Sequence, residues 1–150
     1  QYRIGNINAA FGQGPLQSPP VVNSFSPLHA PPGEIADQGP VAPELQLATE
    51  YLNTTVTNTF YNTIFFRNST SANVPPEGVV IDITQEVALA ADSEALVNRI
   101  AEKLLGGLIS PTLKAEAKAA VERVPVANAG QRISEALYLV ATSPEYVVQR

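Results

Sequence analysis

The sequence predicts a mainly α protein: a bundle of four to six helices over residues 43–150, preceded by an extended proline- and glycine-rich arm over residues 1–42, with at most one short strand. Two observations predict this fold class. Eight of the thirteen prolines and five of the nine glycines fall in residues 1–43. Beyond that point, apolar residues recur at helical spacing between breaks marked by proline and glycine.

Composition limits the chain to one domain and excludes several classes of function. The chain has 150 residues, a mass of 15.9 kDa and 45% hydrophobic residues, which is enough for a single core. Its formal net charge is -5, with nine basic and fourteen acidic residues, which excludes nucleic-acid binding through a basic surface. The absence of cysteine excludes disulfides, thiolate metal sites and a cysteine nucleophile, and the single histidine excludes a multi-histidine metal site.

The arm over residues 1–42 is expected to contain neither a helix nor a central strand. Turn and polyproline signals occur at Gly12–Pro15, Ser18–Pro20 and Ala30–Gly33. Apolar side chains nevertheless recur through the arm, which is untypical of a solvated linker. They are Ile4, Ile7, Phe11, Leu16, Val21, Val22, Phe25, Leu28 and Ile35. We therefore expect the arm to pack on this chain's own helices or on a partner.

Residues 43–66 are predicted to form the first helix, although their composition also carries a strand signal. Pro43 suits the first helical position, and Glu44 suits the positive end of the helix dipole. Apolar residues then share one helical face: Leu45, Leu52, Val56, Phe60 and Ile64. The stretch Thr54–Tyr61 is rich in β-branched and aromatic residues, which favour a strand. Because the apolar face continues through the segment, we predict a helix here.

A break over residues 67–78 separates this helix from the next ones. Residues 79–83 are predicted to form a short strand or an extended lead-in, and Thr84 resembles the capping start of a short helix that runs to Ala90. A longer helix is expected to begin after Asp92, which suits an N-cap, and to stop at Gly106–Gly107. Its apolar face consists of Leu96, Ile100, Leu104 and Leu105.

Serine-proline pairs predict the starts of two further helices. Ser110–Pro111 opens a helix that ends before Pro125 and carries Lys114, Glu116, Lys118 and Glu122 on its solvent side. Asn128–Gly130 is predicted to be a turn. A strongly amphipathic helix then covers residues 131–142, with Ile133, Ala136, Leu137 and Val140 on its apolar side. Ser143–Pro144 predicts a last short helix up to Arg150.

The histidine and the nearby hydroxyls are the first candidates for catalysis. His29 could in principle form a Ser–His–Asp arrangement with Ser24 or Ser26 and with Asp37. Such catalysis needs a base held rigidly within hydrogen-bond reach of the nucleophile, and no nucleophile-elbow motif is present. We therefore predict no catalytic residue in this chain.

Carboxylates and glycines are the candidates for metal or phosphate binding. Glu34, Asp37, Glu44 and Glu50 could together offer oxygen ligands to Ca²⁺, but they lack the spacing of a calcium loop. Residues 12–14, Gly-Gln-Gly, lack the lysine and the following helix of a phosphate-binding loop. We predict no metal-ligating residue, no cofactor-binding residue and no cofactor.

Tyrosines and asparagines offer weaker signals of surface recognition. Tyr138 and Tyr146 fall on predicted helical faces and are expected to be core or interface residues, whereas Tyr51 and Tyr61 are the candidates for carbohydrate contact. Two triplets, beginning at Asn53 and Asn68, permit N-glycosylation in a suitable host. Triplets of this kind also arise by chance in a chain rich in Asn and Thr.

The chain carries neither a membrane span nor a secretory leader in its sequence. No apolar run reaches the ~18 residues that a spanning helix needs. The chain begins with Gln1 and contains no methionine. We therefore expect that it is the cleaved C-terminal piece of a longer precursor.

One run of residues resembles a known family. The segment GQGPLQSPPVVNSFSP at residues 12–27 is similar to a segment of the bacterial exported family catalogued as domain of unknown function 1800. The resemblance continues at residues 31–35, 41–46, 88–92 and 104–107, and at residues 136–146, ALYLVATSPEY. It departs from the family at Val22 and Ser24, where members often have Phe, which puts the packing of the arm in doubt.

The resemblance implies an extracellular or periplasmic location and a longer parent protein. Members of this family are about three times longer than this chain, which resembles only their C-terminal part. The family has no established reaction, so the resemblance assigns no catalytic residue.

These observations together predict a structural or interaction subunit of an extracellular or periplasmic assembly. Its expected partners are other protein subunits: further copies of the chain, or the remaining N-terminal part of the precursor. The helices and the arm are expected to need neighbouring polypeptide to complete their interior. Two alternatives stay open, namely the smaller fragment of a secreted hydrolase-like enzyme with its active groups elsewhere, and a cell-wall or carbohydrate-binding module.

Overall fold

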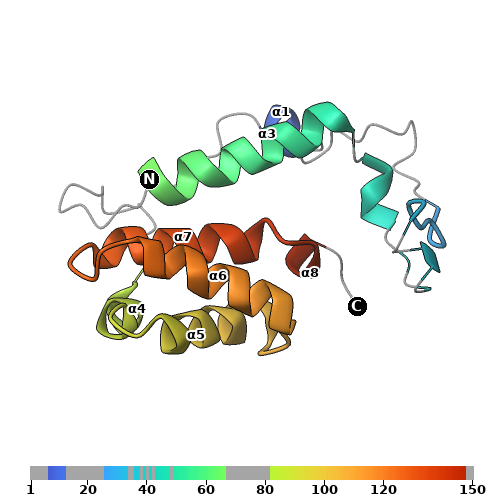
Figure 1. Cartoon of the computed structure of the whole chain (residues 1–150). Helices are drawn as coiled ribbons and strands as arrows, with labels where there is room; N and C mark the ends of the chain where they lie inside the picture. Colours follow the sequence, from blue (N-terminus) through green and yellow to red (C-terminus); the bar gives the residue numbers. More distant parts are fainter. Residues whose placement is uncertain are drawn as a thin grey trace. The chain divides into compact units, whose positions relative to one another are not determined.

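The computed structural model describes residues 7–12, 26–33, 36, 37, 39, 41, 43–47, 49–66 and 82–147 (Figure 1). These residues fall into two compact units. The C-terminal unit comprises residues 60–66 and 82–147, and the N-terminal unit comprises the described residues from 7 to 59. The described residues are mainly helical and contain no strand, which confirms the predicted fold class. Of the predicted strand over residues 79–83, the first three positions lie outside the described residues, and Asp82 and Ile83 are not in a strand.

The C-terminal unit is a bundle of helices with α7 in contact with each of the others. Its helices are α4 (Thr84–Leu89), α5 (Ser93–Leu105), α6 (Pro111–Arg123), α7 (Ala129–Ala141) and α8 (Pro144–Val147). The last residues of α3 and the π-helical turn η2 (Asn62–Phe66) also belong to this unit, and η2 contacts α7. Figure 1 shows α5, α6 and α7 packed side by side.

The apolar faces predicted from the sequence meet in the core of this bundle. The largest of the fully buried side chains, each less than 2% exposed, are Leu96, Val97 and Ile100 of α5, Val121 of α6, and Ile133 and Val140 of α7. Leu104, Leu105 and Leu137 pack around the edge of the same cluster. Each fully buried aliphatic side chain of this size contributes about 1.5–3 kcal/mol to folding. The C-terminal unit therefore closes its own interior, contrary to the expectation that all of the helices need neighbouring polypeptide.

Local signals set the ends of α5 and α6 as predicted. The Asp92 carboxylate accepts the backbone N–H groups of Glu94 and Ala95, each at 3.0 Å. Gly106 ends α5 in the left-handed conformation at φ 60°, which glycine adopts without strain. The Ser110 hydroxyl accepts the N–H of Leu113 at 3.1 Å.

Three predicted helix starts differ in detail from the structure. Asp82 rather than Thr84 supplies the side chain at the start of α4, because its carboxylate accepts the N–H of Thr84 at 2.9 Å. This hydrogen bonding to Thr84 lowers the pKa of Asp82. Helix α7 begins at Ala129, so the predicted turn at residues 128–130 is only the N-cap and the first two helical residues. The Ser143 hydroxyl donates to the Val140 carbonyl, so it closes α7 rather than capping α8.

The predicted helix over residues 43–66 is divided into three parts. A 3₁₀ helix, η1 (Pro43–Leu47), precedes α3 (Glu50–Tyr61), which continues into η2. The chain restarts at Thr49, whose side-chain oxygen accepts the N–H of Leu52 at 3.1 Å and so acts as an N-cap. Sequence periodicity did not reveal this cap, because the apolar face runs past it.

The threonine-rich stretch of α3 is helical, although its composition also carried a strand signal. Thr54, Thr55, Thr57 and Thr59 each donate to the carbonyl oxygen four residues earlier, at 2.7–3.1 Å. Inside a helix, a threonine can satisfy its hydroxyl in this way. The β-branched stretch is therefore helical, with its hydroxyl hydrogens used within α3 itself.

The N-terminal arm contains a helix that the sequence analysis did not predict. Helix α1 (Ile7–Phe11) lies before the first proline of the chain, so no missing N–H or fixed φ prevents it. Gly12 follows it at φ 75° and lies directly against Leu52 of α3, where an added Cβ would come within 2.5 Å of Leu52 Cδ1. This part of the arm thus packs on the chain's own helix. The predicted division into residues 1–42 and 43–150 stays a prediction, because much of the arm lies outside the described residues.

Candidate interaction surface

The residues considered for catalysis do not form a site within the described part of the chain. The backbone N–H of His29 donates to the Ser26 carbonyl at 3.2 Å, which closes a turn, and no hydrogen bond joins the imidazole to a described residue. Asp37 is exposed on the arm. Ser24 and Glu34 lie outside the described residues. No acid–base–nucleophile geometry is therefore seen here.

Carboxylates do not gather into a metal site among the described residues. No group of three or more Asp, Glu or His side chains comes together there. Glu50 is exposed in the first turn of α3, where a negative charge suits the helix dipole. Glu44 lies in η1, and its side chain is not described.

One hydroxyl–carboxylate pair was missed by the sequence analysis. Ser93 at the start of α5 donates to Glu122 Oε1 of α6 at 2.8 Å, which matches the distance between a nucleophile and its base. The residue is only 8% exposed, however, so a substrate has little access to the hydroxyl. The pair therefore serves to hold α5 against α6. Its partners are 29 residues apart, and no local motif announces the contact.

A buried carboxylate on α4 is held by basic residues of α5. The side chain of Glu86 is 5% exposed, and its Oε1 lies 2.8 Å from Lys103 Nζ and 3.6 Å from Arg99 Nε. Burial acts to raise the pKa of Glu86, but the hydrogen bond and charge of Lys103, with the charge of Arg99, outweigh it, so the pKa is lowered. The glutamate thus stays ionised and fixes α4 to α5.

We expect Glu86 to make the stability of the C-terminal unit sensitive to acid. A carboxyl with a lowered folded-state pKa stabilises the fold at pH values above its unfolded pKa, near 4.5, and this stabilisation is lost as the pH falls through the folded pKa. The urea concentration at the midpoint of unfolding should therefore decrease as the pH is lowered from neutral to ~3. This decrease should be smaller in Glu86→Gln. Glu116→Gln, at an exposed position of α6, is the control and should follow the native profile. Identical pH profiles for Glu86→Gln and the native chain would contradict this role.

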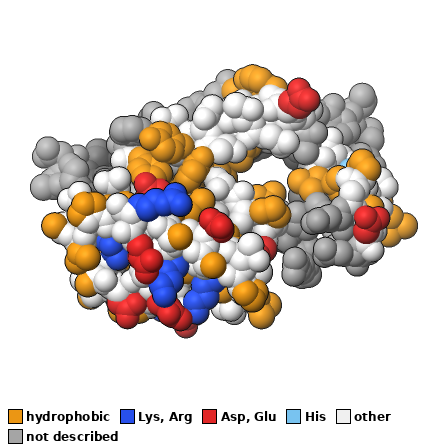
Figure 2. Space-filling model, in the orientation of Figure 1, with side chains coloured by type: hydrophobic (Ala, Val, Ile, Leu, Met, Phe, Trp, Pro, Cys, Tyr) orange, Lys and Arg blue, Asp and Glu red, His pale blue; other side chains and the backbone are white. Residues whose placement is uncertain are grey.

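Charged side chains of opposite sign alternate on the surface of the C-terminal unit. Glu94 of α5 pairs with Lys114 at 3.0 Å and with Lys118 at 3.4 Å, both on α6. Arg99 pairs with Glu102 at 2.9 Å. Figure 2 shows the blue and red side chains interspersed over this unit rather than gathered by sign. This face therefore offers no extended basic patch for nucleic acid.

Tyr61 and Tyr138 belong to an aromatic cluster. Their rings lie 5.7 Å apart edge to face, and Phe65 of η2 lies 4.8 Å from Tyr61 and 5.9 Å from Tyr138. Such distances are those of aromatic rings in direct packing contact. The cluster fixes η2 on α7, together with a hydrogen bond from the Ser134 hydroxyl to the Ile64 carbonyl at 3.3 Å. The expectation that Tyr138 is a core or interface residue agrees with this position.

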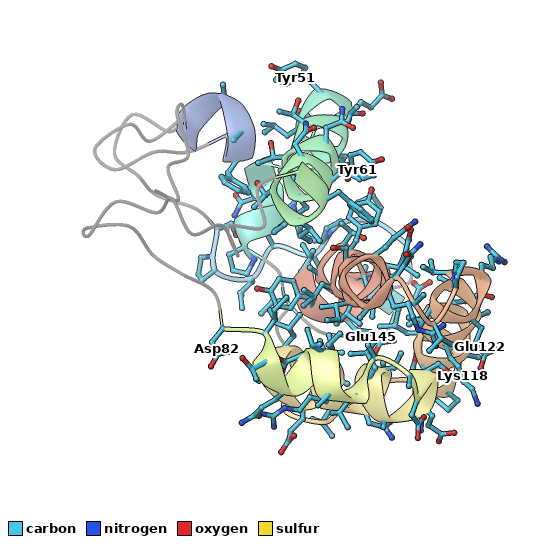
Figure 3. All side chains as sticks on the ribbon, turned by 90° about the vertical axis from the view of Figure 1, so that its left-hand side faces the viewer. Tyr51, Tyr61, Asp82, Lys118, Glu122 and Glu145 are labelled. Atoms are coloured by element: carbon cyan, nitrogen blue, oxygen red, sulfur yellow. The ribbon has the colours of Figure 1, made fainter. Side chains whose placement is uncertain are left out.

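The two tyrosines considered for carbohydrate contact lie at opposite ends of α3. Tyr51 is 67% exposed and projects from the first turn, whereas Tyr61 is in the last turn and in the aromatic cluster (Figure 3). The threonine hydroxyls between them donate within the helix. Asn53 is exposed on α3, and Asn68 lies outside the described residues.

The N-terminal unit exposes apolar side chains, and none of the side chains described in it is completely buried. From residue 9 to residue 59, every side chain that the structure describes is exposed or half-buried, including the apolar positions of α3. Leu28, Val41 and Tyr51 are exposed. Since a stable unit normally buries its larger apolar side chains, this half of the chain is the candidate interaction surface.

The side chain of Gln46 fixes one part of this surface. Its Oε1 accepts the N–H of Ser26 at 3.1 Å, and its Nε2 donates to the carbonyls of Ser26 at 3.1 Å and Pro43 at 3.0 Å. These bonds attach the turn Ser26–His29 to η1. The tip of the turn carries Leu28, which is 80% exposed.

None of the helices among the described residues is long and apolar enough to cross a membrane. Comparison of the chain with protein-family models, with curated proteins and with solved structures finds no match.

Proposed function

We propose that this chain is a structural or interaction subunit whose N-terminal unit packs against a partner polypeptide. The observation that carries the proposal is the contrast between the two units. The C-terminal unit closes a core of its own, whereas none of the side chains described in the N-terminal unit is buried. Apolar side chains that stay exposed to water gain stability when a partner covers them.

The proposal gives the chain no catalytic role. It includes an extracellular or periplasmic location. The resemblance to the exported bacterial family supports a place outside the cytoplasm and an origin in a longer precursor. In that setting the C-terminal unit keeps a closed core of its own. The N-terminal unit is the part that joins the assembly.

Hydrogen exchange of the two units tests the proposal. In the isolated chain, we expect the amides of α3 to exchange at least ~10-fold faster than those of α5, a helix of similar length, because no residue of α3 is buried. In the native particle, α3 should become protected and the mass should exceed the 15.9 kDa of one chain. A native particle with the mass of one chain, in which α3 is as protected as α5, would refute the proposal.

A further inference from the structure

We propose that the turn Ser26–His29 is a preformed docking element that packs Leu28 against an apolar surface of a different polypeptide, and that lysine or arginine side chains border this surface. This inference rests on the proposed function and specifies its partner. It selects a partner other than a second copy of the chain.

The turn has its shape before any partner arrives. The His29 N–H closes it on the Ser26 carbonyl at 3.2 Å, and Pro27 occupies the second position, where its fixed φ suits a β-turn. The three hydrogen bonds of Gln46 hold the turn against η1. An element fixed in this way loses little conformational entropy on binding, so more of the contact energy appears as affinity.

The tip of the turn requires an apolar surface on the partner. Leu28 is 80% exposed, and residues 26–33, SPLHAPPG, contain no acidic, lysine or arginine side chain. A partner that covers this stretch therefore meets leucine and proline side chains rather than charges. A charged group within that surface would be desolvated without a counter-charge.

The charge of the segment that contains the turn indicates which side chains border this apolar surface of the partner. Residues 4–66 contain four acidic residues and neither lysine nor arginine, which gives this segment a formal charge of -4. Of the four, Asp37 and Glu50 are exposed in the structure. A partner that approaches this acidic segment is favoured if it carries basic side chains around the contact.

A second copy of the chain is a poor source of these basic groups, because the whole chain has nine basic against fourteen acidic residues and a formal net charge of -5. Residues 82–147 contain nine acidic and six basic residues, a formal charge of -3. Four of the six basic side chains already pair with carboxylates of their own unit, and Arg132 is buried. Arg123 remains as the one described basic side chain outside these contacts. Two copies would thus bring acidic surfaces together, which disfavours their association through this segment.

Two synthetic amphipathic peptides with the same leucine positions test the proposal, one with lysine and the other with glutamate at every polar position. Binding to the full chain is followed by fluorescence anisotropy of the labelled peptide. We expect the lysine peptide to bind and the glutamate peptide not to bind. Raising the salt concentration should weaken the lysine complex, because added ions screen its charge attraction.

Two leucine variants provide a matched comparison. Leu28→Ser should weaken binding of the lysine peptide ~30-fold, as loss of an interface hot spot does. Leu108 is equally exposed, at 84%, but lies in the C-terminal unit, so Leu108→Ser should change the affinity less than ~2-fold. Gln46→Ala keeps Leu28 but releases the turn, and should weaken binding ~5-fold through the added ordering cost.

Three results would overturn the inference: no binding of the lysine peptide, equal binding of the two peptides, or equal losses in the two leucine variants. Self-association that depends on Leu28, measured by sedimentation without peptide, would also overturn it. That last result would leave the proposed function standing, because the partner would then be a second copy. Hydrogen exchange and the mass of the native particle decide the proposed function separately.

Discussion

Replacement of Leu96 by alanine is expected to lower the free energy of unfolding of the C-terminal unit by about 3 kcal/mol. Leu96 is completely buried in α5 and belongs to the cluster in which α5, α6 and α7 meet. Removing its isopropyl group loses the transfer free energy of the buried methyl groups and leaves a cavity that the surrounding helices fill only in part. Urea unfolding followed by circular dichroism measures the change as a lower midpoint with an unchanged slope.

The matched control for this prediction is Leu108→Ala. Leu108 has the same side chain but is 84% exposed in the loop between α5 and α6, so its truncation should change stability by less than about 0.5 kcal/mol. If both alanine variants lost the same stability, the C-terminal unit would not have the closed core described above.

Replacement of Arg132 by methionine is expected to cost about 3 kcal/mol, because it removes charged hydrogen bonds from a buried position. Arg132 of α7 is 4% exposed, and its guanidinium donates to the Ala90 carbonyl at 2.6 Å and to the Val124 carbonyl at 2.7 Å. These carbonyls lie at the C-terminal ends of α4 and α6, where the helix dipoles are negative. One cation on α7 thus holds the ends of two other helices.

Arg123→Met separates this role from a general effect of losing an arginine. Arg123 is exposed at the end of α6, so its replacement should change stability by less than about 0.5 kcal/mol. The loss of stability in Arg132→Lys should lie between those in Arg132→Met and Arg123→Met, because lysine keeps the charge but lacks the planar guanidinium that reaches two carbonyls. If Arg132→Met unfolded at the same urea concentration as Arg123→Met, the bridge would have no role in stability.

The docking element and the stabilising contacts lie in different units of the chain. Leu96 and Arg132 maintain the C-terminal unit, whereas Leu28 and Gln46 belong to the N-terminal unit. Substitutions at Leu28 should therefore change partner binding without a large change in the stability of the bundle. This separation allows the binding and stability measurements to be interpreted independently.

The sequence by itself determined the helical class and most of the helix boundaries in the C-terminal unit. Asp92, Gly106 and Ser110–Pro111 mark helix ends because capping depends on residues close together in the chain. The apolar face of α5 was also predictable, since periodicity is a local property. The same local signals were insufficient at Thr49 and Ser143, where a hydroxyl had several backbone groups within reach.

Only the tertiary structure decided which residues meet across the bundle and which half of the chain has a closed core. The Arg132 side chain reaches Ala90, 42 positions earlier, and Ser93 meets Glu122 across 29 positions. Sequence spacing does not encode such contacts, because they depend on how helices pack. The exposure of the apolar side chains that are described in the N-terminal unit has the same origin: burial depends on what covers a face, and a sequence shows only that the face is apolar.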